Sequence, residues 1–322
     1  MSTTLDAGQI PAPRELTTNP RTSDKIFRGV VTSFGMTALL ILTLIGLFLS
    51  IRGIQTLHSQ GFGFLTRYNW DVNQTDTGTT YNMGIGAMLI GTVMISLVAL
   101  VVGVPLSVAM ALFLTFYAPA RIKTFLVSVV DLMAAFPSLL FGFWGFFIFM
   151  SSAEYWAKLI NKYLGFIPLF DVPTPIFERS PFIAGLVLAI MIIPIVTSVS
   201  REVFAQTPLD RIQAAYALGA TKWGVIRTVV FPFGSSGVVG GAMLGLGRAF
   251  GETVAVFTVL NIVFKANFHV LYGAGGNIAS LIILKWGEAT GDETTGLLAA
   301  GFILFLMTLL VNLVANYIVR RT

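Results

Sequence analysis

Long apolar runs alternate with shorter polar segments along the whole chain. Most of the runs reach or exceed the roughly 20 residues that a helix needs to cross a bilayer. The pattern predicts an all-α membrane protein with six transmembrane helices. Several runs exceed one perpendicular crossing, so we expect bends at Gly103, Pro105 and Pro137. The six runs cover residues 29–50, 84–116, 124–150, 182–199, 233–264 and 297–318.

The composition agrees with this pattern and excludes an ordinary soluble domain. Hydrophobic residues make up 55% of the chain and charged residues only 11%, whereas soluble domains carry about 25% charged residues. The chain has no cysteine, which excludes disulfides and thiol chemistry. In a soluble protein the net charge of +5 would suggest nucleic acid as a partner. Here membrane lipid is the expected surrounding, and no nucleic-acid partner is expected.

The lysines and arginines predict how the chain crosses the membrane. Six crossings place successive polar segments on opposite sides of the membrane. Lysine and arginine are more frequent on one side, which is therefore expected to be cytoplasmic. Both termini are then inside. The first 28 residues are polar and are expected to form a disordered cytoplasmic tail. Residues 29–83 would hold the first transmembrane helix and an outer loop, and residues 84–318 the transmembrane core.

Arg248 and Glu252 lie within the fifth apolar run. A charge at the centre of a bilayer costs roughly 2.5–3.5 kcal/mol on insertion scales, and such residues usually face a partner or a substrate path. On a continuous helix the two residues would be i, i+4 neighbours on the face that carries Gly237, Gly241 and Gly245. Two interpretations remain open. The pair could neutralise itself and hold helices together, or Arg248 could bind an oxyanion while Glu252 orients it and competes for it.

Two further polar residues in the third run are candidates for the same path. Asp131 is expected to be buried, either as a partner between helices or near the path. Ser138 follows Pro137 and could donate to an anion, or it could satisfy carbonyls that the proline frees. His58 and His269 are isolated and predict no metal site.

Aromatic residues gather in the predicted outer loops. They are expected either to anchor the chain at the membrane interface or to contact a partner on that side. The residues are Tyr68, Trp70, Tyr155, Trp156 and Trp286.

One inner segment, at about residues 205–232, is much longer than the other inner loop. Thr207 and Pro208 are expected to start a short helix that ends at Gly219, and Thr221 to start a second one that ends before Pro232. The segment could be a surface connector or a docking element for a soluble partner.

This segment resembles the EAA loop of ABC-importer permeases. That pattern is Glu-Ala-Ala, then a glycine, then an apolar residue and proline at fixed spacing. The chain has Gln213-Ala214-Ala215, Gly219, Val229 and Phe231-Pro232 at the same spacing, with Gln213 in place of the acidic residue. The resemblance implies that Gln213, Ala214, Ala215, Gly219 and Pro232 belong to the coupling helices that seat on an ATPase subunit.

A second resemblance is to the phosphate-importer permeases of this family. The run from Gly245 to Thr253 is similar to their Gly-Arg-Ala-x-Gly-Glu-Thr signature, and Ser200–Phe204 and Pro137–Gly145 also match. Asn277–Ser280 with Gly287–Ala289 resembles the PstC-type subunit. The resemblance implies the type I ABC importer fold, with cytoplasmic coupling helices. It implies a translocation path that uses Arg248, Glu252, Thr253, Ser138 and Asp131.

The resemblance also implies the rest of the machinery. The chain would be a multi-pass subunit in the plasma membrane of a prokaryote. It would pair with a homologous PstA-type permease, a PstB-type ATPase dimer and a PstS-type phosphate-binding protein. ATP and Mg²⁺ would be bound by the ATPase, and no cofactor by this chain, which has no Gly-Lys dipeptide and hence no P-loop. The alternatives are a permease for sulfate, molybdate or phosphonate, and a secondary transporter.

Overall fold

The computed structural model describes residues 21–75 and 78–321. Its contacts divide the chain into two units, Met1–Phe48 and Leu49–Thr322. Helix α1 (Thr22–Gln60) begins in the first unit. Residues 22–28 are therefore helical, although the sequence placed them in the polar tail, because Ile26 and Phe27 extend the apolar run of the helix. Residues 1–20, the rest of that predicted tail, lie outside the described residues.

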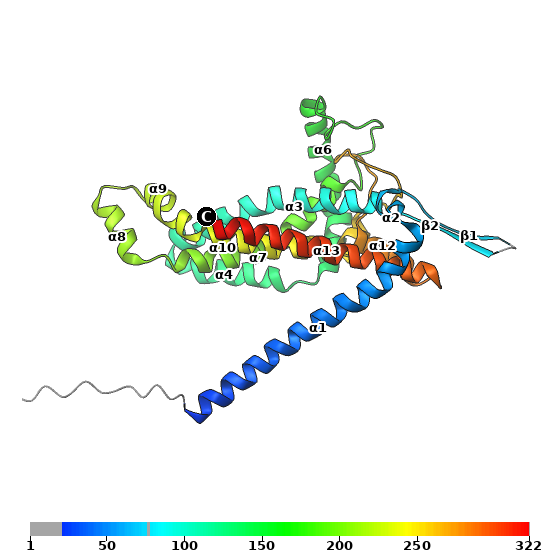
Figure 1. Cartoon of the computed structure of the whole chain (residues 1–322). Helices are drawn as coiled ribbons and strands as arrows, with labels where there is room; N and C mark the ends of the chain where they lie inside the picture. Colours follow the sequence, from blue (N-terminus) through cyan, green and yellow to red (C-terminus); the bar gives the residue numbers. More distant parts are fainter. Residues whose placement is uncertain (1–20, 76–77, 322) are drawn as a thin grey trace, which may run out of the picture. The chain divides into compact units, whose positions relative to one another are not determined.

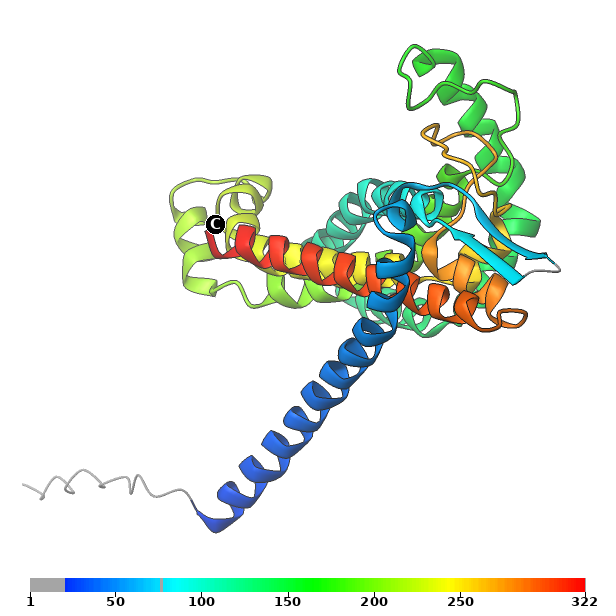
Figure 2. The same ribbon diagram turned by 45° about the vertical axis from the view of Figure 1, so that its right-hand side comes forward.

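Long helices lie side by side in the second unit (Figures 1 and 2). The centre is the pair α3 and α7, which approach closely where Gly103 meets Ile192 and Gly185 meets Val98. Ser180 caps α7, because its hydroxyl accepts from the Ile183 N–H at 3.5 Å. The helix α3 runs on through Pro105 and continues into the π-helical turn η1. These helices are α3 (Gly86–Leu112), η1 (Phe113–Tyr117), α4 (Ala120–Ala135), α7 (Pro181–Ala205), α10 (Phe231–Gly251) and α13 (Asp292–Arg321).

The third apolar run, residues 124–150, is broken. The helix α4 ends at Ala135, and the chain resumes at Ser138 after a bend of 94°. Phe136 and Pro137 are extended between the two helices, as expected for a proline and its preceding residue. After the bend come α5 (Ser138–Trp144), η2 (Gly145–Phe149) and α6 (Met150–Leu164). By length and composition five described helices could cross a membrane, or six if the bent pair is one crossing.

One end of the second unit, called the hairpin end after its two paired strands, holds short elements between the long helices. They are α2 (Gly63–Thr66), β1 (Trp70–Thr75), β2 (Gly78–Met83), α11 (Val254–Val259) and α12 (Ile278–Trp286). The strands pair antiparallel, with Trp70 opposite Met83. Trp70 is buried, and its indole N–H donates to Glu293 Oε1 at 2.8 Å. Trp70 is thus a core residue and not an interface anchor. The all-α class is confirmed, with this hairpin as a small addition.

The opposite end holds α8 (Leu209–Ala217), α9 (Lys222–Val225) and the π-helical turn η3 (Ile226–Val230) (Figure 1). Thr221 caps α9, since its hydroxyl accepts from the Gly224 N–H at 3.2 Å. Gly219 ends the first helix with φ +85°. Both predictions are confirmed. Thr207 does not cap α8, because Pro208 takes the N-cap position and the Thr207 hydroxyl is buried without a hydrogen-bond partner.

Pro232 does not end a helix. Residues Lys222–Gly251 form one apolar helix of 30 residues, whereas the sequence predicted a stop before the proline. The π-helical turn directly before it explains the difference. There the Phe231 N–H donates to Ile226 O, five residues back. This looser register removes the clash that a proline ring makes with the carbonyl four residues earlier.

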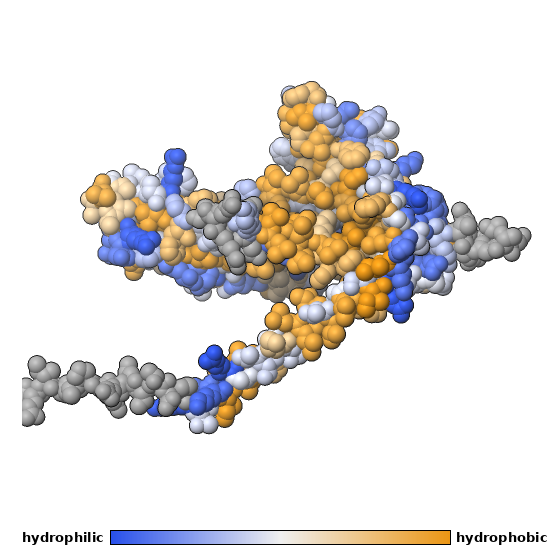
Figure 3. All heavy atoms as spheres, viewed as in Figure 1, coloured by the Kyte–Doolittle hydropathy of each residue, from blue (hydrophilic) through white to orange (hydrophobic). Residues whose placement is uncertain are grey.

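The hydropathy of the surface of the second unit changes along the long helices. Figure 3 shows hydrophobic residues over much of the long helices, mainly hydrophilic residues at the hairpin end, and both kinds mixed at the α8–α9 end. This distribution is the one expected of a chain whose middle lies in lipid.

Candidate functional site

Glycines on two faces of α10 have different surroundings. A Cβ on Gly237 would collide with Val203, and one on Gly245 would lie 3.0 Å from Val196, both on α7. The predicted close packing of this stripe is confirmed. A Cβ on Gly240, Gly247 or Gly251 would meet nothing within 4 Å. The helix therefore presents one glycine face to α7 and another to open space.

The helix α10 ends one residue before Glu252. Glu252 has φ −70° and ψ 121° and lies outside the helix. The predicted helical pairing of Arg248 with Glu252 is therefore wrong for this structure. Instead the Glu252 carboxylate accepts from the Ala255 N–H at 3.2 Å, and its backbone carbonyl accepts from the Asn277 side chain at 2.7 Å. These two hydrogen bonds favour a break over a further helical turn.

Arg248 lies in the last turn of α10 and is half-buried. Its Nε is buried without a hydrogen-bond partner. No ion pair or hydrogen bond within the described part of the chain involves its guanidinium. A half-buried cation without a partner among the described residues is available to an anion or to another subunit.

Thr253 follows the break and donates from its hydroxyl to Gly251 O at 3.1 Å. Both residues line a hollow of about 560 Å³ whose other wall is Ala279, Ile282 and Trp286 on or beside α12. Thr253 thus lies at an open surface next to the helix break.

The other two candidates fall in different surroundings. Ser138 is the first residue of α5, which packs on α11, so it belongs to the elements around the break. Asp131 is exposed on α4, although the sequence predicted a buried acid. The inward positions of α4 include Leu126, Val130 and Met133. Asp131 is turned about 100° from Val130 and therefore points elsewhere.

The residues of the α8–α9 end form an exposed surface. Gln213 and Ala214 are exposed on α8, and Ala215 is half-buried against the core of this end. No residue of α8 is buried. Leu218 is 89% exposed at the tip, next to Gly219. A helix whose residues are mostly exposed is suited to contact a partner.

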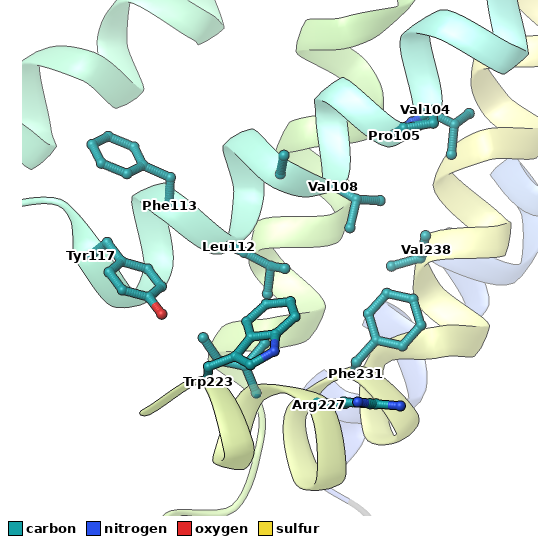
Figure 4. A pocket seen from close by; sticks show the side chains of 12 residues that line it. Val104, Pro105, Val108, Leu112, Phe113, Tyr117, Trp223, Arg227, Phe231 and Val238 are labelled. Atoms are coloured by element: carbon teal, nitrogen blue, oxygen red, sulfur yellow. The ribbon is translucent and has the colours of Figure 1, made fainter. Parts of the chain in front are cut away.

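A second hollow, of about 810 Å³, lies between α3 and the helix that starts at α9 (Figure 4). Its walls are apolar, including Val108, Leu112 and Phe231, and Arg227 is the one charged residue in the lining. Apart from Arg227, this lining offers few polar groups to an anion. The helix break is therefore the better candidate site.

Comparison with known proteins identifies the family of this chain. Residues 103–322 match the family described as "Binding-protein-dependent transport system inner membrane component". The chain belongs to this family. It is 40% identical over 301 residues to the phosphate transport system permease protein PstC 2 of Mycobacterium tuberculosis, with 92% of each chain covered. It is 42% identical over 275 residues to the PstC protein of Mycobacterium leprae, covering 84% of this chain and 85% of the relative.

A solved structure supports the fold of this inner membrane component. A bacterial ABC transporter chain involved in the import of the polysaccharide alginate aligns with a TM-score of 0.57 at 16% identity. The alignment covers 92% of this chain and 99% of the other. The chain is thus a multi-pass membrane subunit with the ABC importer permease fold, and it is not itself catalytic. Membership also implies a separate binding protein and a separate ATPase.

The sequence missed the structural role of Asn277 at this site. In the sequence, Asn277 was noticed only as part of the segment Asn277–Ser280, which resembles a family pattern. A local signal was present, because an asparagine directly before the apolar run Ile278–Trp286 is a typical helix cap. No local pattern, however, indicates that the same side chain reaches Glu252, 25 residues earlier.

Proposed function

We propose that this chain is a membrane-spanning subunit of an ATP-driven importer of inorganic phosphate. Its relatives at 40–42% identity are phosphate transport permeases. The observation that carries the proposal is Arg248, a half-buried guanidinium without a partner in the described chain. An arginine fork matches the oxygens of a tetrahedral oxyanion and binds them with charge-assisted hydrogen bonds.

The proposed path runs past the break at the end of α10. Arg248 binds phosphate, and Thr253 and Ser138 offer hydroxyl groups from neighbouring elements. Glu252, four residues from Arg248 in the chain, competes for the guanidinium in states where the helix extends, so the anion can be released. Asp131 is exposed on α4. In this proposal it contacts the second permease subunit.

The proposed coupling surface is the α8–α9 end. Gln213, Ala214 and Ala215 on α8, with Gly219 at its end, would seat on the ATPase. Pro232 lies inside the helix Lys222–Gly251, so motion at α9 reaches Arg248 along one helix. The glutamine at position 213 would contact the ATPase through hydrogen bonds instead of an ion pair.

The proposed partners are a homologous PstA-type permease, a PstB-type ATPase dimer and a PstS-type phosphate-binding protein. ATP and Mg²⁺ would be bound by the ATPase, and no cofactor by this chain. The open face of α10, where a Cβ on Gly240 or Gly247 would meet nothing within 4 Å, supports a close approach of another helix on that side.

Uptake of labelled phosphate by the complete complex in proteoliposomes tests this function. Arg248→Ala is expected to lower uptake about tenfold to a hundredfold, as for the loss of a hydrogen-bonded charge worth about 1.5–3 kcal/mol. Arg248→Lys should fall between, because lysine keeps the charge but lacks the fork.

Arg52→Ala is the matched control, since Arg52 is an exposed arginine outside the site. Unchanged uptake in an assembled Arg248→Ala complex would contradict the proposal. Stronger competition by sulfate or phosphonate than by arsenate would instead assign another oxyanion.

A further inference from the structure

Asn277 joins two segments through the two ends of its side-chain amide. It is 1% exposed and caps α12. Its Oδ1 accepts from the Ser280 N–H at 2.8 Å. Its Nδ2 donates to the Glu252 carbonyl at 2.7 Å. An amide can do both at once because one end accepts and the other donates.

Neighbouring contacts with α3 fix the position of Asn277. The Ile278 N–H donates to the Thr92 hydroxyl at 3.1 Å, and Thr92 is 1% exposed. At Gly91, the residue directly before Thr92, a Cβ would collide with the Gly276 carbonyl, so the two backbones touch. The start of α12 therefore cannot shift relative to α3 without losing these contacts.

The fixed amide holds Glu252 out of the helix. The backbone carbonyl of Glu252 accepts a hydrogen bond from outside α10, and the Glu252 ψ of 121° ends the helical hydrogen-bond pattern. If α10 continued by one turn, Glu252 would face Arg248 at i, i+4, where an ion pair forms readily. Within the described residues no such ion pair is present. The hydrogen bond from Asn277 and the free guanidinium of Arg248 therefore belong to the same arrangement.

We infer that Asn277 is a positioning residue for anion binding: it holds Glu252 away from Arg248 and so keeps the guanidinium open to phosphate. The inference rests on the proposed function, in which Arg248 binds the anion. Asn277 itself does not touch the anion. Loss of its donor lets Glu252 neutralise Arg248, and the affinity for phosphate falls.

Asn277→Asp removes the donor to Glu252 and keeps the acceptor that caps α12. In the complete complex in proteoliposomes we expect a rise of about tenfold in the KM for phosphate uptake, equivalent to about 1.4 kcal/mol. Vmax per assembled complex should change less. The decisive variant adds Glu252→Gln to Asn277→Asp. Glutamine cannot form the ion pair with Arg248, so the double variant should return to the KM of Glu252→Gln alone.

Two further variants separate positioning from folding. Ser280→Ala breaks the capping box of the same helix end but leaves the bond from Asn277 to Glu252, so its KM should match that of the parent. Asn277→Ser keeps an uncharged cap that is one atom shorter, and should raise the KM as Asn277→Asp does.

The outcomes are distinct. An unchanged KM in assembled Asn277 variants would overturn the inference, as would a raised KM that Glu252→Gln leaves uncorrected. If neither Asn277 variant assembles, with or without Glu252→Gln, the residue is structural and the inference is also overturned. Full uptake by Arg248→Ala would instead overturn the proposed function.

Discussion

The two ends of the helix Lys222–Gly251 reverse what their sequences suggest. Near the α8–α9 end the helix contains Pro232, the residue that most often stops a helix, yet it runs on without a break. At the other end an apolar sequence continues to Phe264 without proline, yet the helix stops at Gly251.

Different interactions explain the two outcomes. At the α8–α9 end the cause is local, because the π-helical turn η3 changes the hydrogen-bond register just before the proline. At the other end the cause is tertiary, because Asn277 binds the Glu252 carbonyl from another element. In the proposed function, the helix is continuous where motion from the ATPase would pass and ends where the anion would bind. Three predictions test the parts of this comparison, beginning with the largest effect.

The middle of the helix must stay packed on α7 if the two ends are to move together. Gly237→Ala should be the most damaging change, because its Cβ collides with Val203. We expect a loss of about 1–3 kcal/mol in stability, as for overpacking in a core. Gly240→Ala is the matched control on the open face, where a Cβ meets nothing within 4 Å. Thermal unfolding of the purified complex measures both. Equal melting temperatures for the two variants would contradict the packing argument.

The α8–α9 end depends on one backbone conformation. Gly219 has φ +85°, which costs an alanine about 1–2 kcal/mol. Gly219→Ala should therefore misplace α8. In the complete complex, the rate of ATP hydrolysis stimulated by the transported substrate should then fall. Gly224→Ala is the control in the same segment, because its Cβ would make ordinary contacts of 3.4 Å and 3.6 Å with Thr221 and Ala220. If both variants hydrolyse ATP like the parent, the end of α8 does not determine coupling.

Much of the fold could be predicted from the sequence because it depends on local or periodic signals. The apolar runs indicated the long helices, Gly219 indicated the end of α8, and Thr221 indicated the start of α9. The stripe of Gly237, Gly241 and Gly245 indicated close packing, since a missing side chain on one helical face admits another helix.

The misplaced features depend on contacts between distant segments. A helical wheel drawn through Glu252 assumed a continuous helix, which Asn277 prevents. Asp131 was expected inside because acids are costly in apolar runs, but the inward face of α4 is set by its packing on α7. Arg248 was singled out from the sequence as a charge within an apolar run, whereas its lack of a partner among the described residues required the structure.

The smallest effect is expected at Pro232. The helix already passes through this residue, and the residue lies at an exposed position on the first turn of α10. Pro232→Ala restores an N–H where the π-helical turn has displaced the register, so stability should change by less than about 0.5 kcal/mol. The ratio of phosphate transported to ATP hydrolysed should equal that of the parent complex. A fall in this ratio with stability unchanged would mean that the proline itself is a hinge, and that motion bends the helix at η3 before it reaches Arg248.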